Sequence, residues 1–168
     1  ESRAICNSRF SLALMQTHTN WSIDLSSGTD NYLVTISKKL KRDLRARRRS
    51  AVKHYGELAL KQIGGQKEVE HYFDLYLQFS RSAFSSRNRR SSFEDRRLAS
   101  FVKDFLIIMD QRQRLDAHVL LAGENPLAIS FGYRFGKGFH WALTAFDYTY
   151  RNVRPGYLLI EELIREMT

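Results

Sequence analysis

The sequence predicts one α+β domain, in which helices flank a mostly antiparallel sheet. Three long segments have apolar residues at three- and four-residue steps, which is typical of helices with one buried face. These predicted helices span residues 31–55, 67–84 and 94–111. Three shorter apolar runs follow, separated by brief turns that contain glycine, as in an antiparallel meander. These predicted strands span residues 115–122, 127–135 and 139–146.

The N-terminal part gives weaker signals. Residues 1–20 show no clear period, and we take them as a poorly defined lead-in to a single domain that spans residues 1–168. Apolar and polar residues alternate over 21–25, which predicts a short strand. The first long helix then follows and ends at Gly56, the residue type that most often ends a helix.

That first helix holds most of the net charge of the chain. Residues 38–53 contain nine basic residues and one acid, Asp43, whereas the whole chain has a net charge of +9. Such a helix face is most often simply solvated, but clustered Lys and Arg also form the usual footprint of a nucleic-acid site. Both interpretations stay open, and three loop arginines extend the second one: Arg87, Arg89 and Arg90.

The next segments form the expected core. A strand is predicted over 57–63, ended by Gly64 and Gly65. The helix over 67–84 has a wide aromatic stripe, for which core packing is favoured over a ligand-stacking surface. The polar, basic stretch 85–92 predicts a loop.

The most informative stretch is the turn that opens the last helix. It has the sequence Arg154-Pro155-Gly156 and follows the strand over 139–146. Free backbone N–H groups and the helix dipole make such a helix start a binding site for anions. Proline suits the first helical position, and glycine lets a phosphate approach the backbone. The turn therefore predicts a site for the pyrophosphate of a nucleotide-like cofactor; the alternative is an ordinary start of a surface helix.

Several other chemistries are not indicated. The five histidines show no metal-ligand spacing, and neither a Gly-x-Ser-x-Gly motif nor a phosphate loop is present, so no metal is expected. No apolar run approaches the roughly 20 residues that span a membrane. The single cysteine, Cys6, fits a reducing compartment, and we expect a cytoplasmic protein. The helix at the end of the chain is still in register at Met167, which suggests a fragment of a longer protein.

Three stretches resemble a known group of enzymes. They are the basic helix over 37–45, the turn Leu-Leu-Ala-Gly-Glu-Asn-Pro-Leu-Ala-Ile-Ser over 120–130, and Asp147 followed by Arg-Pro-Gly-Tyr-Leu-Leu over 154–159. In this order they resemble the CelD-like acetyltransferases of cellulose and exopolysaccharide biosynthesis. That group belongs to the GNAT acyltransferase superfamily and is related to the Fem-type aminoacyltransferases. The resemblance covers about residues 21–168, and Arg154 stands where the group usually has serine.

The resemblance implies a GNAT-like fold, a mostly antiparallel mixed sheet whose last strands lie beyond this chain. It also implies that acetyl-CoA or another acyl-CoA is the cosubstrate. Its diphosphate would bind the backbone N–H groups of Gly156, Tyr157 and Leu158, with Arg154 and Arg151 adding charge. The pantetheine would lie along the strand over 139–146. There, a backbone N–H near Leu143 or Thr144 would polarise the thioester carbonyl.

Candidate catalytic residues follow from the same resemblance. His140 and Asp147 are candidate proton acceptors, and Tyr148 is a candidate donor to the leaving thiolate. His140 shares its expected strand alternation with Thr144, which would place both on one face. The acceptor is expected to be a small molecule or a glycan. Nucleic acid, including aminoacyl-tRNA as in the Fem relatives, is the alternative partner, and a non-catalytic GNAT-like module is the third hypothesis.

Overall fold

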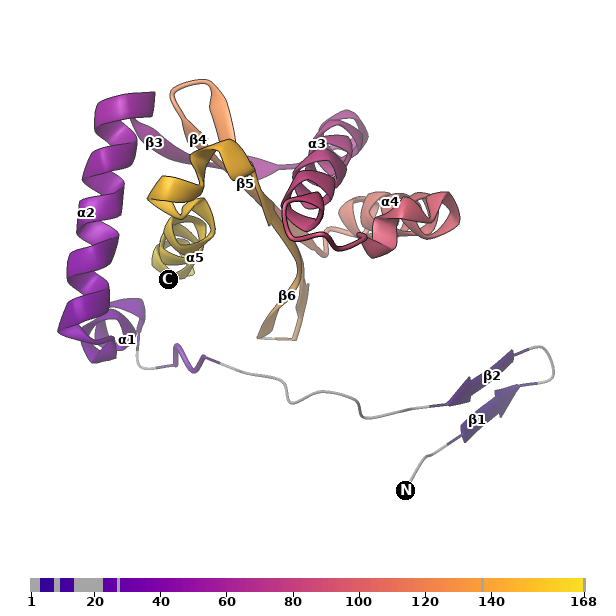
Figure 1. The fold of residues 1–168 in the computed structure, drawn as a ribbon. Coiled ribbons are helices and arrows are strands. Elements are labelled where there is room, and N and C mark those ends of the chain that lie inside the picture. The colour runs from indigo at the N-terminus through magenta and orange to yellow at the C-terminus, as the bar shows by residue number, and fades with distance from the viewer. Residues whose placement is uncertain (1–3, 8–9, 14–22, 27, 137, 168) are drawn as a thin grey trace.

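The structure is a computed structural model that describes residues 4–7, 10–13, 23–26, 28–136 and 138–167 (Figure 1). Its helices are α1 (Thr29–Thr35), α2 (Lys38–Tyr55), α3 (Gln66–Ser85), α4 (Arg96–Gln111) and α5 (Pro155–Glu166). Its strands are β1 (Ala4–Asn7), β2 (Phe10–Ala13), β3 (Leu58–Ile63), β4 (Leu115–Ala122), β5 (Asn125–Phe135) and β6 (Gly138–Phe146). Two short 3₁₀ helices are η1 (Ser92–Glu94) and η2 (Tyr148–Val153).

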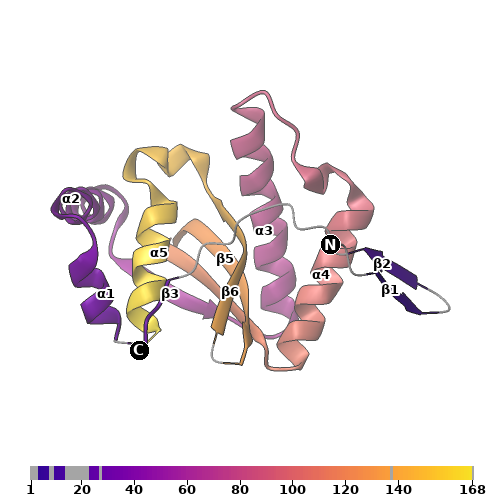
Figure 2. The ribbon, with the colours of Figure 1, turned by 90° about the horizontal axis from the view of Figure 1, so that it is seen from below.

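Four strands form the central sheet, in the order β3-β4-β5-β6, and each neighbouring pair is antiparallel. Helices α3 and α4 lie on one side of the sheet, and α5 and α2 lie on the other, as the view in Figure 2 shows. In the described part of the chain, β6 is therefore an edge strand, with its outer side free of any strand neighbour. The predicted α+β fold, with helices flanking an antiparallel sheet, is confirmed.

Each face of the sheet has its own apolar core, because side chains alternate between the faces along a strand. On the α3 side, Val119, Ile129 and Phe131 pack with the aromatic stripe of α3. On the α5 side, Leu120 and Ala128 pack with residues of α2 and α5. The core interpretation of the aromatic stripe is therefore confirmed.

The sheet contains an irregularity in β6 that affects the candidate site. Phe131 of β5 pairs with Leu143, but the next residue, Gly132, pairs with Trp141. Ala142 is thus an extra residue, which makes a β-bulge. A bulge shifts the alternation of side chains by one residue. Even-numbered residues before the bulge therefore lie on the other face of the sheet from even-numbered residues after it.

The long helix predicted over 31–55 is two helices in the structure. Ile36 is extended, and Ser37 caps the second helix, with its Oγ accepting a hydrogen bond from Leu40 N–H at 3.2 Å. Serine is a preferred N-cap residue, so a new helix begins at this position although the apolar period continues through it. The predicted end at Gly56 is confirmed: the residue has a φ of 103° and donates its N–H to Val52.

The predictions for the N-terminal part agree less well with the structure. Residues 4–13, for which we predicted no element, contain the antiparallel pair β1 and β2. The strand predicted over 21–25 is wrong for residues 23–25, which are not in a strand, and residues 21–22 lie outside the described part.

Candidate functional site

The start of α5 is the centre of the candidate site. Strand β6 leads through η2 to Arg154, which has a left-handed backbone (φ 51°, ψ 63°), and the helix begins at Pro155. A left-handed residue turns the chain sharply, at a cost of about 1–2 kcal/mol for a residue other than glycine. This conformation places Arg154 and Gly156 at the first turn of α5, next to the end of β6. A Cβ atom added to Gly156 would lie 3.9 Å from the ring of Phe146.

The backbone amides of this turn differ from the sequence-based expectation. Tyr157 and Leu158 both donate their N–H groups to the carbonyl of Arg154, at 3.0 and 3.4 Å. The N–H of Gly156 has no hydrogen-bond partner among the residues that the structure describes. Of the three predicted phosphate-binding amides, Gly156 is therefore the one that is fully available, since its two successors already have an acceptor.

Two arginines flank the start of the helix. The guanidinium of Arg154 lies 3.4 Å from Asp43 of α2 and stacks over the ring of Tyr157, while that of Arg151 stacks over the ring of Tyr148. Arg154 borders a hollow of about 620 Å³, whose other lining residues come from the end of the α1–α2 connection and from α2. These residues are Ser37, Lys39, Leu40, Arg42, Asp43 and Ala46. The hollow has three cations and one carboxylate, and so suits an anion.

The residues of β6 divide between the two faces of the sheet. Thr144 pairs with Ser130 on the α5 side, whereas His140 pairs with Tyr133 and stacks on its ring, with centroids 5.0 Å apart. The expectation that His140 and Thr144 share a face is therefore wrong, because the bulge at Ala142 lies between them. Leu143, directly after the bulge, packs its side chain against the core on the α3 side.

The other two candidate catalytic residues lie at the far end of β6. Asp147 caps η2, since its Oδ1 accepts hydrogen bonds from the N–H and the hydroxyl of Thr149 at 2.9 and 2.7 Å. Tyr148 follows it and contacts Arg151. Asp147 lies seven positions after His140, or about 23 Å along an extended strand. The structure therefore does not bring the predicted proton acceptors into one site.

A buried polar cluster on β4 and β5 was missed by the sequence analysis. Asp116, His118 and Ser130 are at most 7% exposed. His118 Nδ1 lies 3.3 Å from Asp116 Oδ1 without the geometry of a hydrogen bond, and Asp116 pairs with Arg134 at 2.5 Å. Alternation of Asp116 and His118 on a predicted strand places both on one face. However, the sequence does not show that this face is covered by α5.

This cluster should make stability depend on pH. Burial lowers the pKa of His118 below its ordinary value of 6.5, and Arg134 acts in the same direction, against the opposing effect of Asp116 and Glu166. An unfolded chain thus takes up a proton near pH 6.5 that the folded chain still excludes, so folding stability falls as the pH drops below that value.

We expect chemical denaturation between pH 7 and pH 5 to show this loss, and His118→Gln to reduce it. His54→Gln, at an exposed position of α2, is the matched control and should keep the wild-type dependence. Equal pH dependence in His118→Gln and the wild type would contradict this role of His118.

Within the described ranges, no helix is long and apolar enough to cross a membrane. Over the same residues, no group of three His, Cys, Asp or Glu side chains is arranged to hold a metal ion.

The edge strand β6 thus leads through η2 into α5, whose first turn has an open amide, an arrangement that can bind an anion. The family model described as "Acetyltransferase (GNAT) domain" matches residues 38–168. The chain therefore belongs to the GNAT acetyltransferase family.

Comparison with solved structures supports the fold alone. A protein from Bacteroides thetaiotaomicron VPI-5482, described as a conserved protein of unknown function, is similar with a TM-score of 0.58 and 13% sequence identity. The match covers 83% of this chain and 45% of that one, so this chain spans less than half the length of the solved protein. None of the curated proteins matches the chain.

Proposed function

We propose that the chain is an acyl-CoA-dependent N- or O-acyltransferase that transfers an acetyl or related acyl group directly from the thioester to its acceptor. The observation that carries the proposal is the open amide of Gly156 at the start of α5, directly beyond the free edge strand β6. Membership of the GNAT family supports the reaction class.

The fit of an acyl-CoA rests on three features of this chain. Gly156 offers its N–H to the diphosphate, and the approach is open, because even a Cβ at this position would have only the ring of Phe146 near it, at 3.9 Å. Arg151 in η2 and Arg154 at the N-cap of α5 supply positive charge just before the turn. The outer side of β6 offers backbone groups along which the pantetheine can extend, and the bulge at Ala142 interrupts their regular spacing.

Bound in this way, the cosubstrate supplies an activated acyl group, and the chain positions it and moves the proton. A backbone N–H next to the bulge, of Leu143 or Thr144, polarises the thioester carbonyl. The acceptor amine or hydroxyl attacks that carbon and loses a proton, and the thiolate leaves and takes up one.

His140 is the better placed of the two candidate proton acceptors. It is exposed and lies two residues before the bulge. Asp147 instead lies next to the helix that receives the diphosphate, and its Oδ1 already caps η2. Tyr148 lies at that same end of β6 and is less well placed to protonate a thiolate near the bulge.

The finer assignment follows the sequence resemblance. We propose membership of the CelD-like group, a cytoplasmic location, and a sugar of an exopolysaccharide or another small molecule as the acceptor. The order of the three matching stretches supports this choice. The stretch over 120–130 joins β4 to β5, and the stretch formed by Asp147 and 154–159 follows β6 and includes the start of α5.

The test is release of free thiol from acetyl-CoA, measured with a panel of amine and hydroxyl acceptors. We expect acceptor-dependent release. His140→Asn should lower turnover by about 100-fold, the lower end of the contribution of a positioned general base, whereas Asp147→Asn should lower stability more than turnover because Asp147 caps η2. Tight binding of CoA without turnover of any acceptor would instead favour a non-catalytic module.

The ion pair between Arg154 and Asp43 gives a test with two opposite expected results. Arg154→Gln should weaken binding of CoA about 10-fold, the lower end of the effect of a hydrogen bond to a charged group. Asp43→Asn should strengthen it by a few-fold, because it removes a carboxylate that competes for Arg154 at 3.4 Å. Isothermal calorimetry measures both. Equal weakening in the two variants would contradict a phosphate role for Arg154, since a general loss of structure affects both alike.

A further inference from the structure

The basic residues of α2 do not all have the same role in the structure. Arg47 donates to the carbonyl of Asn152, and Arg48 pairs with Glu161 and Glu162 of α5. Lys41 donates to the carbonyl of Val34 at 2.9 Å. These three side chains hold α2 against its neighbours, so they account for part of the charge that the sequence concentrates here.

The other basic side chains of α2 are exposed, and over the described residues none of them has a carboxylate within salt-bridge distance. They are Lys38, Lys39, Arg42, Arg45, Arg49 and Lys53. A hollow of about 280 Å³ on this helix is lined entirely by basic residues: Lys38, Lys41, Arg42, Arg45 and Arg49. Without nearby carboxylates, these cations repel one another, and an anionic partner would relieve that repulsion.

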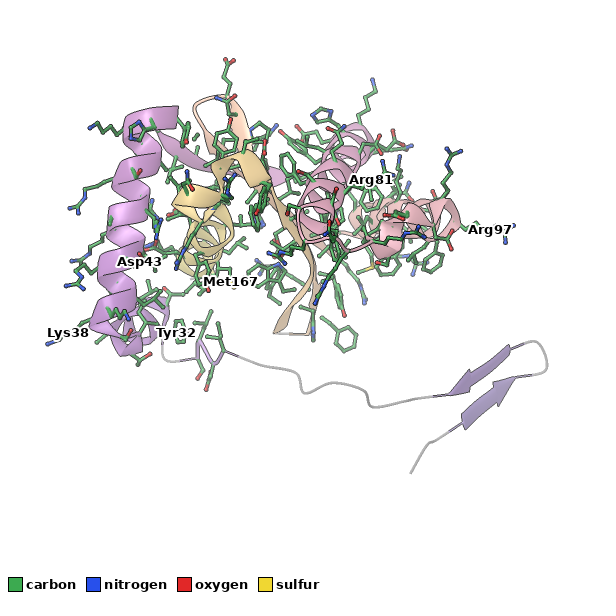
Figure 3. All side chains as sticks on the ribbon, in the orientation of Figure 1. Tyr32, Lys38, Asp43, Arg81, Arg97 and Met167 are labelled. Carbon is green, nitrogen blue, oxygen red and sulfur yellow. The ribbon has the colours of Figure 1, made fainter. Side chains whose placement is uncertain are left out.

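Four of these residues form a straight stripe. At about 100° per residue, Lys38, Arg42, Arg45 and Arg49 lie within roughly 60° of one another around the helix. The buried residues Leu44 and Ala51 lie on the opposite side, against the core. Figure 3 shows Lys38 pointing away from α5, whereas Asp43 lies on the side of α2 towards α5. We define this set, with Lys41 at its margin, as the α2 cation stripe.

The spacing of the stripe matches a linear polyanion. From Lys38 to Arg49 the helix rises about 16 Å, so five cations give one charge per roughly 4 Å. A nucleic-acid strand carries one phosphate per about 3.4 Å along its axis. A membrane surface suits the stripe less well, because a membrane-binding helix also inserts an apolar face, and the apolar face of α2 is buried in the core.

We propose that the α2 cation stripe binds the phosphate backbone of a nucleic acid. This surface borders the proposed acyl-CoA site, because Arg42 lines both hollows, but Arg154 itself lies on the Asp43 side of α2 and Lys38, Arg45 and Arg49 line the stripe alone. The predicted extension of the patch by Arg87, Arg89 and Arg90 is wrong, because that loop follows α3, on the other side of the sheet from α2 (Figure 1). These loop arginines therefore provide a matched control.

The experiment measures binding of a fluorescent 20-nucleotide single-stranded RNA, and of the corresponding duplex, by anisotropy from 50 to 300 mM salt. Five phosphate contacts predict a slope of log K against log salt of about −3.5 for the single strand and −4.5 for the duplex. The triple variant Lys38→Glu, Arg45→Glu, Arg49→Glu should weaken binding at 150 mM salt by at least about 50-fold, from three lost contacts.

The control variant combines two of these loop arginines with the exposed Arg81 of α3, because Arg90 lies 3.9 Å from Glu94. This variant, Arg81→Glu, Arg87→Glu, Arg89→Glu, has the same change in net charge and should keep binding within about threefold. Thermal melting should show both variants folded, since all six side chains are exposed. Equal weakening in the two variants would show that binding depends only on net charge, and would overturn the proposal. So would a salt slope shallower than about −1.5, or stripe-dependent binding to vesicles with anionic lipid headgroups but not to RNA or DNA.

Discussion

Replacing Gly156 by tryptophan is expected to weaken binding of CoA by about 100-fold, or roughly 2.7 kcal/mol. The indole would extend from a Cβ that lies over the first turn of α5 and would cover the one fully available amide there. A charge-assisted hydrogen bond and the close approach of the diphosphate would be lost together. Calorimetric titration of the wild type and the variant with CoA measures the effect.

Gly156→Ala is the matched control for this substitution. Its methyl group fits at 3.9 Å from Phe146, and the backbone N–H remains open. Alanine is also a better helix former than glycine, by up to about 1 kcal/mol. We therefore expect the alanine variant to bind CoA nearly as well as the wild type and to melt slightly higher. Loss of binding in both variants alike would point to a disturbed turn and away from a covered amide.

Replacing Phe131 by alanine is expected to destabilise the fold by about 3–5 kcal/mol. Phe131 is fully buried and packs its ring against Phe73 and Tyr76 of α3, with centroids 6.1 Å away in each case. It also pairs with Leu143 at the bulge of β6, so the cavity lies beneath the candidate thioester position. A domain of this size should lose roughly 10 °C of melting temperature.

Phe101→Ala on α4 is the comparison for that result. It removes the same side chain from a position that is 67% exposed, so it should change stability by less than about 1 kcal/mol. A similar loss in both variants would contradict the assignment of the aromatic core to the space between α3 and the sheet.

Local periodicity was sufficient to predict most of the architecture. The apolar stripe of α3 and the runs that became β4, β5 and β6 are strong signals, and their turns contain glycine at 123 and 136 with positive φ. The start of α5 could also be predicted from the sequence, because proline fixes φ near the helical value and glycine leaves the backbone accessible. Ser37 is a typical N-cap residue for α2, but the apolar period continues through it, so the sequence did not indicate that α1 and α2 are separate helices.

The features that decide the site arise from pairing across the chain. No residue type marks Ala142 as a bulge, since the extra residue is defined by the register between β5 and β6. That register decides which face of the sheet His140 lies on. The sequence alone therefore could not show that His140 and Thr144 lie on different faces. The pair of Arg154 with Asp43 joins residues far apart in sequence, and only the fold brings them to 3.4 Å.

The backbone amide of Gly156 offers the most direct measurement. The chain has nine glycines, so a protein labelled with ¹⁵N-glycine gives a simple amide spectrum, and Gly156→Ala identifies the signal of Gly156. Titration with CoA should move that signal more than any other glycine signal, in the direction of a stronger hydrogen bond, while Gly64 and Gly65 at the start of α3 stay in place. A Gly156 signal that stays fixed while CoA binds, or a spectrum unchanged at millimolar CoA, would contradict the account.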